Sequence, residues 1–148
     1  MSVIVYDGQT MASDRQGCCG DTIRTAKKLF RQSNGDIVGF TGGLGAGMVM
    51  VKWHEDGADP DKWPKCNEDD GWVHFVVASK NGVYFYEKYP CPIPVVDPFS
   101  AWGNGREVAL GALAMGADAV TAVEITSRFI TGVGNGCDHF DIPVNTGG

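Results

Sequence analysis

A serine at the second position is the residue with the most evident chemical potential in this chain. Ser2 becomes the N-terminal residue when Met1 is removed, and its side chain is small enough for cytosolic methionine excision. A serine that carries its own α-amine combines a nucleophile with a base, because the pKa of such an amine is ordinarily about 7.7 to 8.0. Its chemistry would be attack of the hydroxyl on a carbonyl carbon. The alternative is that Ser2 is an ordinary residue at the start of a strand.

The elements next to Ser2 are expected to bury it at a strand end. Residues 2–6 are apolar and lead into the hairpin signal Asp7-Gly8, after which residues 10–13 form the returning strand. A loop is expected at residues 18–20. Short strands are expected to follow at residues 21–23, 27–30 and 37–41.

A glycine-rich segment at residues 42–47 follows the last of these strands and leads into a buried helix, expected at residues 48–53 and fading by Gly57. Backbone N–H groups gathered at a helix start are suited to bind an anion. The dinucleotide-binding pattern G-x-G-x-x-G is not met, however, because the spacing here is Gly43-x-Gly45-x-Gly47. We therefore expect no cofactor.

The second half of the chain is expected to supply a loop, a hairpin, two helices and a last strand. Residues 55–71 are acidic and contain proline, which indicates a solvated loop anchored by Trp63. The clearest hairpin joins strands at residues 72–79 and 83–86. The remaining elements are an extended connection at 90–99, helices at 106–115 and 119–127, and an edge strand at 137–143. The many alanines and glycines of the two helices indicate close packing against a sheet or another helix.

The composition excludes several classes of function. At 148 residues the chain is long enough for one domain, which we place at residues 1–148. A net charge of -6 disfavours a nucleic-acid partner. The sequence contains no apolar run long enough to span a bilayer and no signal peptide, so we expect a cytoplasmic protein without a membrane partner. The five cysteines form no C-x-x-C pair, and His74 fits a hydrogen-bonded sheet histidine, so we expect no metal site.

Five short motifs, taken in order, resemble proteasome β subunits and the bacterial HslV peptidase. They are Ser2-Val3-Ile4-Val5, Ala12-Ser13-Asp14, Lys27-Lys28, Gly39-Phe40-Thr41-Gly42-Gly43 and Gly103-Asn104-Gly105-Arg106-Glu107-Val108-Ala109-Leu110-Gly111-Ala112. Residues 112–124 are also similar to short HslV-like sequences of bacteria and their phages. The resemblance covers nearly the whole chain and implies the α+β N-terminal-nucleophile (Ntn) hydrolase fold, an αββα sandwich of two antiparallel sheets between helices. One helical layer is expected to be abridged, because the acidic Trp63 loop replaces a family helix.

The resemblance also implies roles for individual residues. The family's nucleophilic threonine falls on Ser2, its strand-end aspartate on Asp14 and its active-site lysine on Lys28. Its oxyanion-hole N–H falls on Gly42. Asn104 stands where the family generally has a serine between two glycines, and its amide can partly replace that serine as a hydrogen-bonding group.

The implied function is a peptidase that acts on peptides or unfolded proteins, assembles as a homo-oligomer, with a ring as one form, and can work with an ATP-dependent unfoldase. Two departures leave a second reading open: Asn104 replaces a serine, and the aspartate expected before Thr131 is missing. In that reading the protein is a catalytically inactive relative with a structural or interaction role, as in a phage particle. A third reading is an Ntn amidohydrolase for a small amide, which a deep pocket closed by the Trp63 loop would favour.

Overall fold

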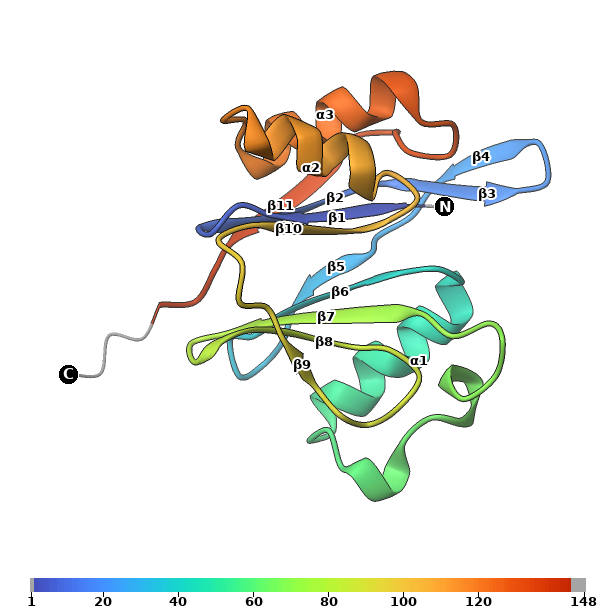
Figure 1. The fold of residues 1–148 in the computed structure, drawn as a ribbon. Helices are drawn as coiled ribbons and strands as arrows, with labels where there is room; N and C mark the ends of the chain where they lie inside the picture. Colours follow the sequence, from blue (N-terminus) through green and yellow to red (C-terminus); the bar gives the residue numbers. More distant parts are fainter. Residues whose placement is uncertain (1, 145–148) are drawn as a thin grey trace.

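Two antiparallel sheets stacked on one another form the centre of the molecule in the computed structural model, which describes residues 2–144 (Figure 1). The first sheet has the order β10-β1-β2-β11 and the second has the order β5-β6-β7-β8-β9. The strands of the first sheet are β1 (Val3–Tyr6), β2 (Thr10–Asp14), β10 (Ser100–Gly103) and β11 (Cys137–Asp141). Those of the second are β5 (Leu29–Arg31), β6 (Ile37–Thr41), β7 (His74–Ser79), β8 (Gly82–Tyr86) and β9 (Ile93–Pro94).

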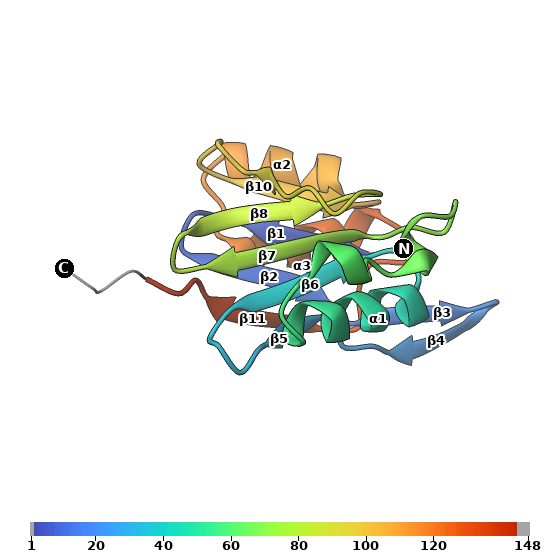
Figure 2. The ribbon, with the colours of Figure 1, turned by 90° about the horizontal axis from the view of Figure 1, so that it is seen from below.

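Helices cover the outer face of each sheet. The α-helices are α1 (Leu44–Glu55), α2 (Arg106–Ala114) and α3 (Ala119–Phe129). Helices α2 and α3 lie side by side on the first sheet, and α1 lies on the second (Figures 1 and 2). Two 3-10 turns, η1 (Pro60–Lys62) and η2 (Lys65–Asn67), follow α1. The architecture is therefore the expected αββα sandwich, with a single α-helix in the second helical layer of the described chain.

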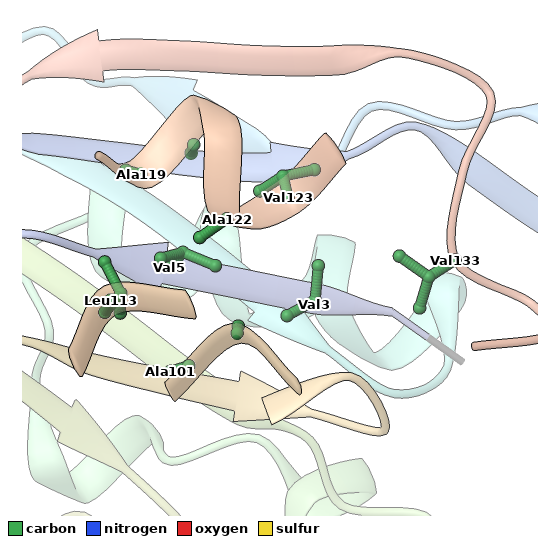
Figure 3. Close-up of a cluster of buried hydrophobic side chains, with 10 residues drawn as sticks. Val3, Val5, Ala101, Leu113, Ala119, Ala122, Val123 and Val133 are labelled. Atoms are coloured by element: carbon green, nitrogen blue, oxygen red, sulfur yellow. The ribbon is translucent and has the colours of Figure 1, made fainter. Parts of the chain in front are cut away.

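Strand β1 is buried on both faces because it lies in the middle of this sandwich. Alternate residues of a strand point to opposite faces. Val3 and Val5 accordingly pack towards α2 and α3, where small side chains such as Ala122 allow the helices to approach closely (Figure 3). Ile4 points to the other side and joins the cluster between the two sheets. The expected close packing of the alanine-rich helices is confirmed.

Glycine brings α1 close to the second sheet. A Cβ atom at Gly47 would lie 2.1 Å from the ring of Phe40 on β6, so the helix can occupy this position only with glycine there. Around this contact the apolar side of α1, which includes Trp53, joins Trp63 in one buried cluster. The expectation that Trp63 anchors its loop is confirmed, since its indole packs edge-on against that of Trp53 with ring centroids 4.9 Å apart.

Two expectations were wrong in detail, and one strand was not expected. Residues 18–20 are not a simple loop, because β3 (Gln16–Cys19) pairs with β4 (Thr22–Thr25) in a hairpin that projects from the body (Figures 1 and 2). Residues 100–103 form β10, which pairs with β1. The local sequence shows no strand pattern there, and the strand depends on hydrogen bonds to its partner.

The second error concerns α1, which begins at Leu44 rather than Met48 and is not fully buried. Met48 and Val49 are 46% and 47% exposed, because they lie on the side of the helix that faces away from the sheet. The edge position of the last strand is confirmed, with β11 paired to β2. Among the helices of residues 2–144, none has the length and apolar character needed to cross a membrane.

Candidate active site

Ser2 lies directly before β1, at the end of the molecule where several strand ends meet. Its side chain is enclosed, with only 2% of the residue exposed. Within residues 2–144 the Ser2 Oγ atom has no hydrogen-bond partner, although it is buried. Ser2 lines a cavity of about 560 Å³ together with Gly42 and Asn104. Buried hydroxyls are nearly always hydrogen bonded, so an unpartnered one beside a cavity is unusual.

The segment Gly103-Asn104-Gly105 wraps around the backbone of Ser2. Val3 pairs with Gly103 across β1 and β10, and the Gly105 N–H donates to the Ser2 carbonyl oxygen at 3.4 Å. A Cβ atom at Gly103 would lie 2.2 Å from that carbonyl oxygen, and φ is +100°, so a side chain is excluded there. A Cβ atom at Gly105 would lie 2.3 Å from Thr126. Gly103 is therefore required by the backbone of Ser2 and Gly105 by the side chain of Thr126, whereas Asn104 is exposed and lines the cavity.

Asp14 is the last residue of β2 and is fully buried. Its Oδ1 atom accepts hydrogen bonds from the Val3 N–H at 3.1 Å and from Lys28 Nζ at 3.0 Å. Its Oδ2 atom accepts from the N–H groups of Gln16 and Gly134, at 3.3 and 3.2 Å. The carboxylate thus ties the residue after Ser2 to Lys28 through a single oxygen atom.

Lys28 lies immediately before β5 and is 2% exposed. Burial disfavours the charged amine and lowers the pKa of Lys28, and the Asp14 carboxylate opposes this shift without cancelling it. Taking two charges out of water is costly, and ion pairs with a shifted pKa are frequent at functional sites. The structure therefore connects Asp14 and Lys28 to Ser2 through the N–H of Val3, the residue that follows it.

Gly42 follows β6, whose last residue, Thr41, pairs with His74 at the start of β7. Its φ of +122° is favourable only for glycine, and a Cβ atom would lie 2.8 Å from Val73. Gly42 also lines a second cavity, of about 510 Å³, together with Lys28 and Cys18. It therefore lies between two cavities, one bordered by Ser2 and the other by Lys28.

Sequence reasoning missed several residues of the Ser2 cavity, namely Asp70, Trp72, His74, Trp102 and Arg106. Asp70 belongs to the acidic loop expected to be solvated. His74 has the hydrogen-bond partner that we expected, since its Nε2 lies 3.0 Å from a carboxylate oxygen of Glu87. No local signal identifies these residues, because strand pairing and the path of the loop bring them to Ser2.

Three other sequence expectations bear on the site. Trp63 packs against α1 and does not line the Ser2 cavity. At the positions where the expected aspartate is missing, Arg128 and Phe129 are exposed. Met1 lies outside the described residues. Within residues 2–144 no group of His, Cys, Asp and Glu side chains is arranged to hold a metal ion.

The fold agrees with those of solved proteasome-like peptidases. No protein-family model matches the sequence, and no curated protein matches it. The Thiobacillus denitrificans protein BPH, solved in complex with epoxomicin, aligns with 98% of this chain and 100% of its own at 15% identity and a TM-score of 0.77. A second BPH structure gives 16% identity and a TM-score of 0.75 over 99% of this chain and 100% of its own.

HslV from Trypanosoma brucei aligns with 95% of this chain and 97% of its own, at 20% identity and a TM-score of 0.71. Identities this low establish the fold and not the chemistry. The likeness agrees with the resemblance expected from the motifs around Ser2, Asp14, Lys28 and Gly42. The chain has the fold of the HslV-type, proteasome-like peptidases, which is the Ntn-hydrolase sandwich.

Proposed function

We propose that this protein is a peptidase of the HslV type in which Ser2 is the nucleophile, once the residue before it has been removed. The observation that carries the proposal is the Ser2 hydroxyl, which is buried, has no hydrogen-bond partner within residues 2–144 and borders a cavity. A buried hydroxyl without a partner is a cost to folding. A hydroxyl that reacts with a substrate gives a functional reason for this cost.

The first step is attack of Ser2 Oγ on the carbonyl carbon of a peptide bond. The proton of the hydroxyl passes to the free α-amine of Ser2, which acts as the base. The tetrahedral intermediate then collapses, the C–N bond breaks, and the same proton passes to the departing amine. The acyl group remains on Ser2 as an ester, which a water molecule hydrolyses.

Lys28 and Asp14 support this step by electrostatics. A positive charge close to the N-terminus favours the neutral form of the α-amine, which is the form that accepts a proton. Asp14 holds Lys28 in position and binds the Val3 N–H through the same carboxylate oxygen. The pair is thus attached directly to the residue that follows the nucleophile.

The Gly42 N–H is the proposed oxyanion donor. A donor at such a position stabilises the negative charge on the tetrahedral intermediate and typically accounts for about 3 to 4 kcal/mol of the barrier. Asn104 lines the same cavity as Ser2 and Gly42, and its side-chain amide is available to a substrate. We propose Ser2, Asp14, Lys28, Gly42 and Asn104 as the functional set.

We further propose that the substrate is a peptide or an unfolded protein and that the protein works as a homo-oligomer. The side of α1 that faces away from the sheet exposes Leu44, Met48 and Val49. Clusters of exposed apolar side chains often mark protein contacts. We propose that a second copy of the chain covers this face. We also propose that such copies form a ring and that the ring works with an ATP-dependent unfoldase.

Hydrolysis of a short fluorogenic peptide tests the proposal. Ser2→Ala removes the hydroxyl and is expected to reduce cleavage to background, whereas Ser2→Thr keeps it and is expected to retain activity. A Ser2→Ala protein as active as the wild type would exclude Ser2 as the nucleophile.

A second candidate function is a non-catalytic interaction protein with the same fold. It is favoured by Asn104, whose side chain forms no hydrogen bond within residues 2–144, and by the absent aspartate before Thr131. In that case the purified protein would retain Met1, and Lys28 and Asp14 would serve only to hold the sheets together. An amidohydrolase for a small amide stays a third candidate: Trp63 itself does not line the Ser2 cavity, but Asp70 of the same loop does.

A further inference from the structure

The part of the Ser2 cavity that the proposed chemistry leaves unused has an aromatic wall. Trp72, His74 and Trp102 all line the cavity. The rings of Trp72 and His74 meet edge to face with centroids 4.8 Å apart. Phe85 lies behind them, 6.2 Å from His74 and 5.7 Å from Trp102. The wall is therefore a continuous group of π faces and edges beside the nucleophile.

An acidic side chain lies at the same part of the cavity. The side chain of Asp70 lines it and forms no hydrogen bond or ion pair within residues 2–144. Glu68 and Asp69 precede it in the exposed loop, and Glu87 is hydrogen bonded to Nε2 of His74, although none of these three lines the cavity itself. Arg106 is the cation among the lining residues, and one of its N–H groups donates to the Gly103 carbonyl oxygen at 3.1 Å. The guanidinium is thereby held at the Gly103 side.

We infer that this cavity is a specificity subsite for a basic side chain of the substrate, next to the bond that is cleaved, with Asp70 as the specificity-determining residue. An ammonium or guanidinium group placed there would lie near the Asp70 carboxylate and the indole ring of Trp72. Carboxylates and the faces of aromatic rings both attract cations. The buried Ser2 hydroxyl, which has no hydrogen-bond partner within residues 2–144 and belongs to a residue that lines the same cavity, is the independent sign that a ligand enters it. This inference rests on the proposed peptidase function.

The opposite assignment, an acidic side chain bound by Arg106, is less favoured by the same contacts. An incoming carboxylate would meet the Asp70 carboxylate, and like charges repel. A carboxylate would also not be attracted by the faces of the aromatic rings, because a π face is negative. The two assignments predict opposite substrate preferences, so one experiment separates them.

Binding to the Ser2→Ala protein tests the inference without any need for cleavage. The probes are blocked tetrapeptide amides with Lys, norleucine or Glu at each position in turn, and the readout is the dissociation constant from titration calorimetry. At one position the Lys peptide is expected to bind about five- to tenfold more tightly than the norleucine peptide, and less so at high salt. Asp70→Asn in the same background should abolish that preference.

Asp69→Asn is the matched control, because Asp69 is the adjacent exposed carboxylate and does not line the cavity. It should leave the preference for Lys within about twofold. A preference for Glu that depends on Arg106, equal binding of all three peptides, or no binding of any of them would overturn the subsite. Cleavage of the same peptides by the Ser2 protein is measured in parallel. Lys-selective, Asp70-dependent binding without cleavage would therefore refute the peptidase function and leave the subsite standing.

Discussion

At the scale of single residues, the site is organised by the Asp14 carboxylate, which binds Lys28 and the amide that follows Ser2. The motifs suggested Ser2, Asp14, Lys28, Gly42 and Asn104 as a set. The structure explains how Asp14 and Lys28 of that set are joined. Asp14 at the end of β2 is hydrogen bonded both to the first residue of β1 and to Lys28, directly before β5. The sequence offered no comparable signal for Asp70, whose place beside Ser2 depends on the course of a loop.

Removing the charge of Lys28 is expected to affect both stability and activity. Lys28→Met leaves the Asp14 carboxylate buried without its cation, which should lower the free energy of unfolding by about 3 to 5 kcal/mol. Peptide cleavage should also fall by at least about 100-fold. Denaturant titration and initial rates measure the two effects.

Lys27→Met is the matched control for this prediction. Lys27 is the neighbouring lysine, is exposed and lies over the ring of Phe30. Its replacement should change the unfolding free energy by less than about 1 kcal/mol and leave cleavage intact. Equal effects at the two lysines would contradict the role given to the buried pair.

At the scale of elements, the sequence predicted those strands and helices whose own residues form a pattern. Strand β1 alternates between two apolar faces, and α3 begins at the N-cap Asp118, whose side chain accepts from the Thr121 N–H. Strand β10 and the β3–β4 hairpin were missed, because Ser100–Gly103 and Gln16–Cys19 have no such alternation and depend on their partners. The start of α1 was misplaced because its glycines resemble a loop.

A pair of glycine substitutions in α1 tests why this helix contains glycines. Gly47→Ala forces a methyl group against Phe40 and should destabilise the protein by about 1 to 3 kcal/mol. Gly45→Ala meets nothing within 4 Å and should stabilise the helix by up to about 1 kcal/mol. Opposite shifts in the denaturation midpoint are expected, and shifts of the same sign would contradict the proposed packing.

His54, near the end of α1, is expected to make stability fall in acid. Its Nδ1 contacts Gln32, its Nε2 lies 3.4 Å from the Tyr84 hydroxyl, and burial lowers the pKa of His54. The folded state therefore holds the neutral ring, whereas the unfolded chain takes up a proton near pH 6.5. The stabilisation is complete above that pH and is lost as the pH falls towards the lowered pKa.

Denaturation at pH 7.5 and pH 5 should show this loss in the wild type and a smaller loss in His54→Gln. His139→Gln, at an exposed histidine, is the control and should behave as the wild type. If the His54 variant and the wild type lost the same stability between pH 7.5 and pH 5, the role given to His54 would be contradicted.

Burial also raises the pKa of Tyr84 to about 12, so its contribution has the opposite sign. That contribution is present below pH 10 and is lost as the pH rises through 12.

At the scale of the whole molecule, the αββα stacking and the abridged helical layer followed from the order of elements and the motif resemblance. The consequence of the missing helix was not visible in the sequence. The outer side of α1 has no α-helical neighbour within residues 2–144, and Met48 and Val49 are left nearly half exposed. We expect a second copy of the chain to cover this face.

Light scattering after size-exclusion chromatography measures that association. The wild type should elute as a multiple of the chain mass, and Met48→Glu should shift it towards the monomer, because a charge is costly in an apolar contact. Glu107→Lys, on the exposed side of α2, is the control and should not shift the protein towards the monomer. A wild-type protein that is monomeric at micromolar concentration would contradict the oligomer.

The role of Ser2 as nucleophile is tested by the intact mass of the purified protein before and after incubation with epoxomicin, a peptide epoxyketone that needs both a hydroxyl and a free α-amine. We expect a chain that begins at Ser2, gains one inhibitor mass and carries the adduct on Ser2, with no adduct on the Ser2→Ala protein. A chain that begins at Ser2 and gains no mass would contradict the nucleophile. A chain that retains Met1 and gains no mass would instead favour the non-catalytic function, with Lys28 and Asp14 as parts of the scaffold.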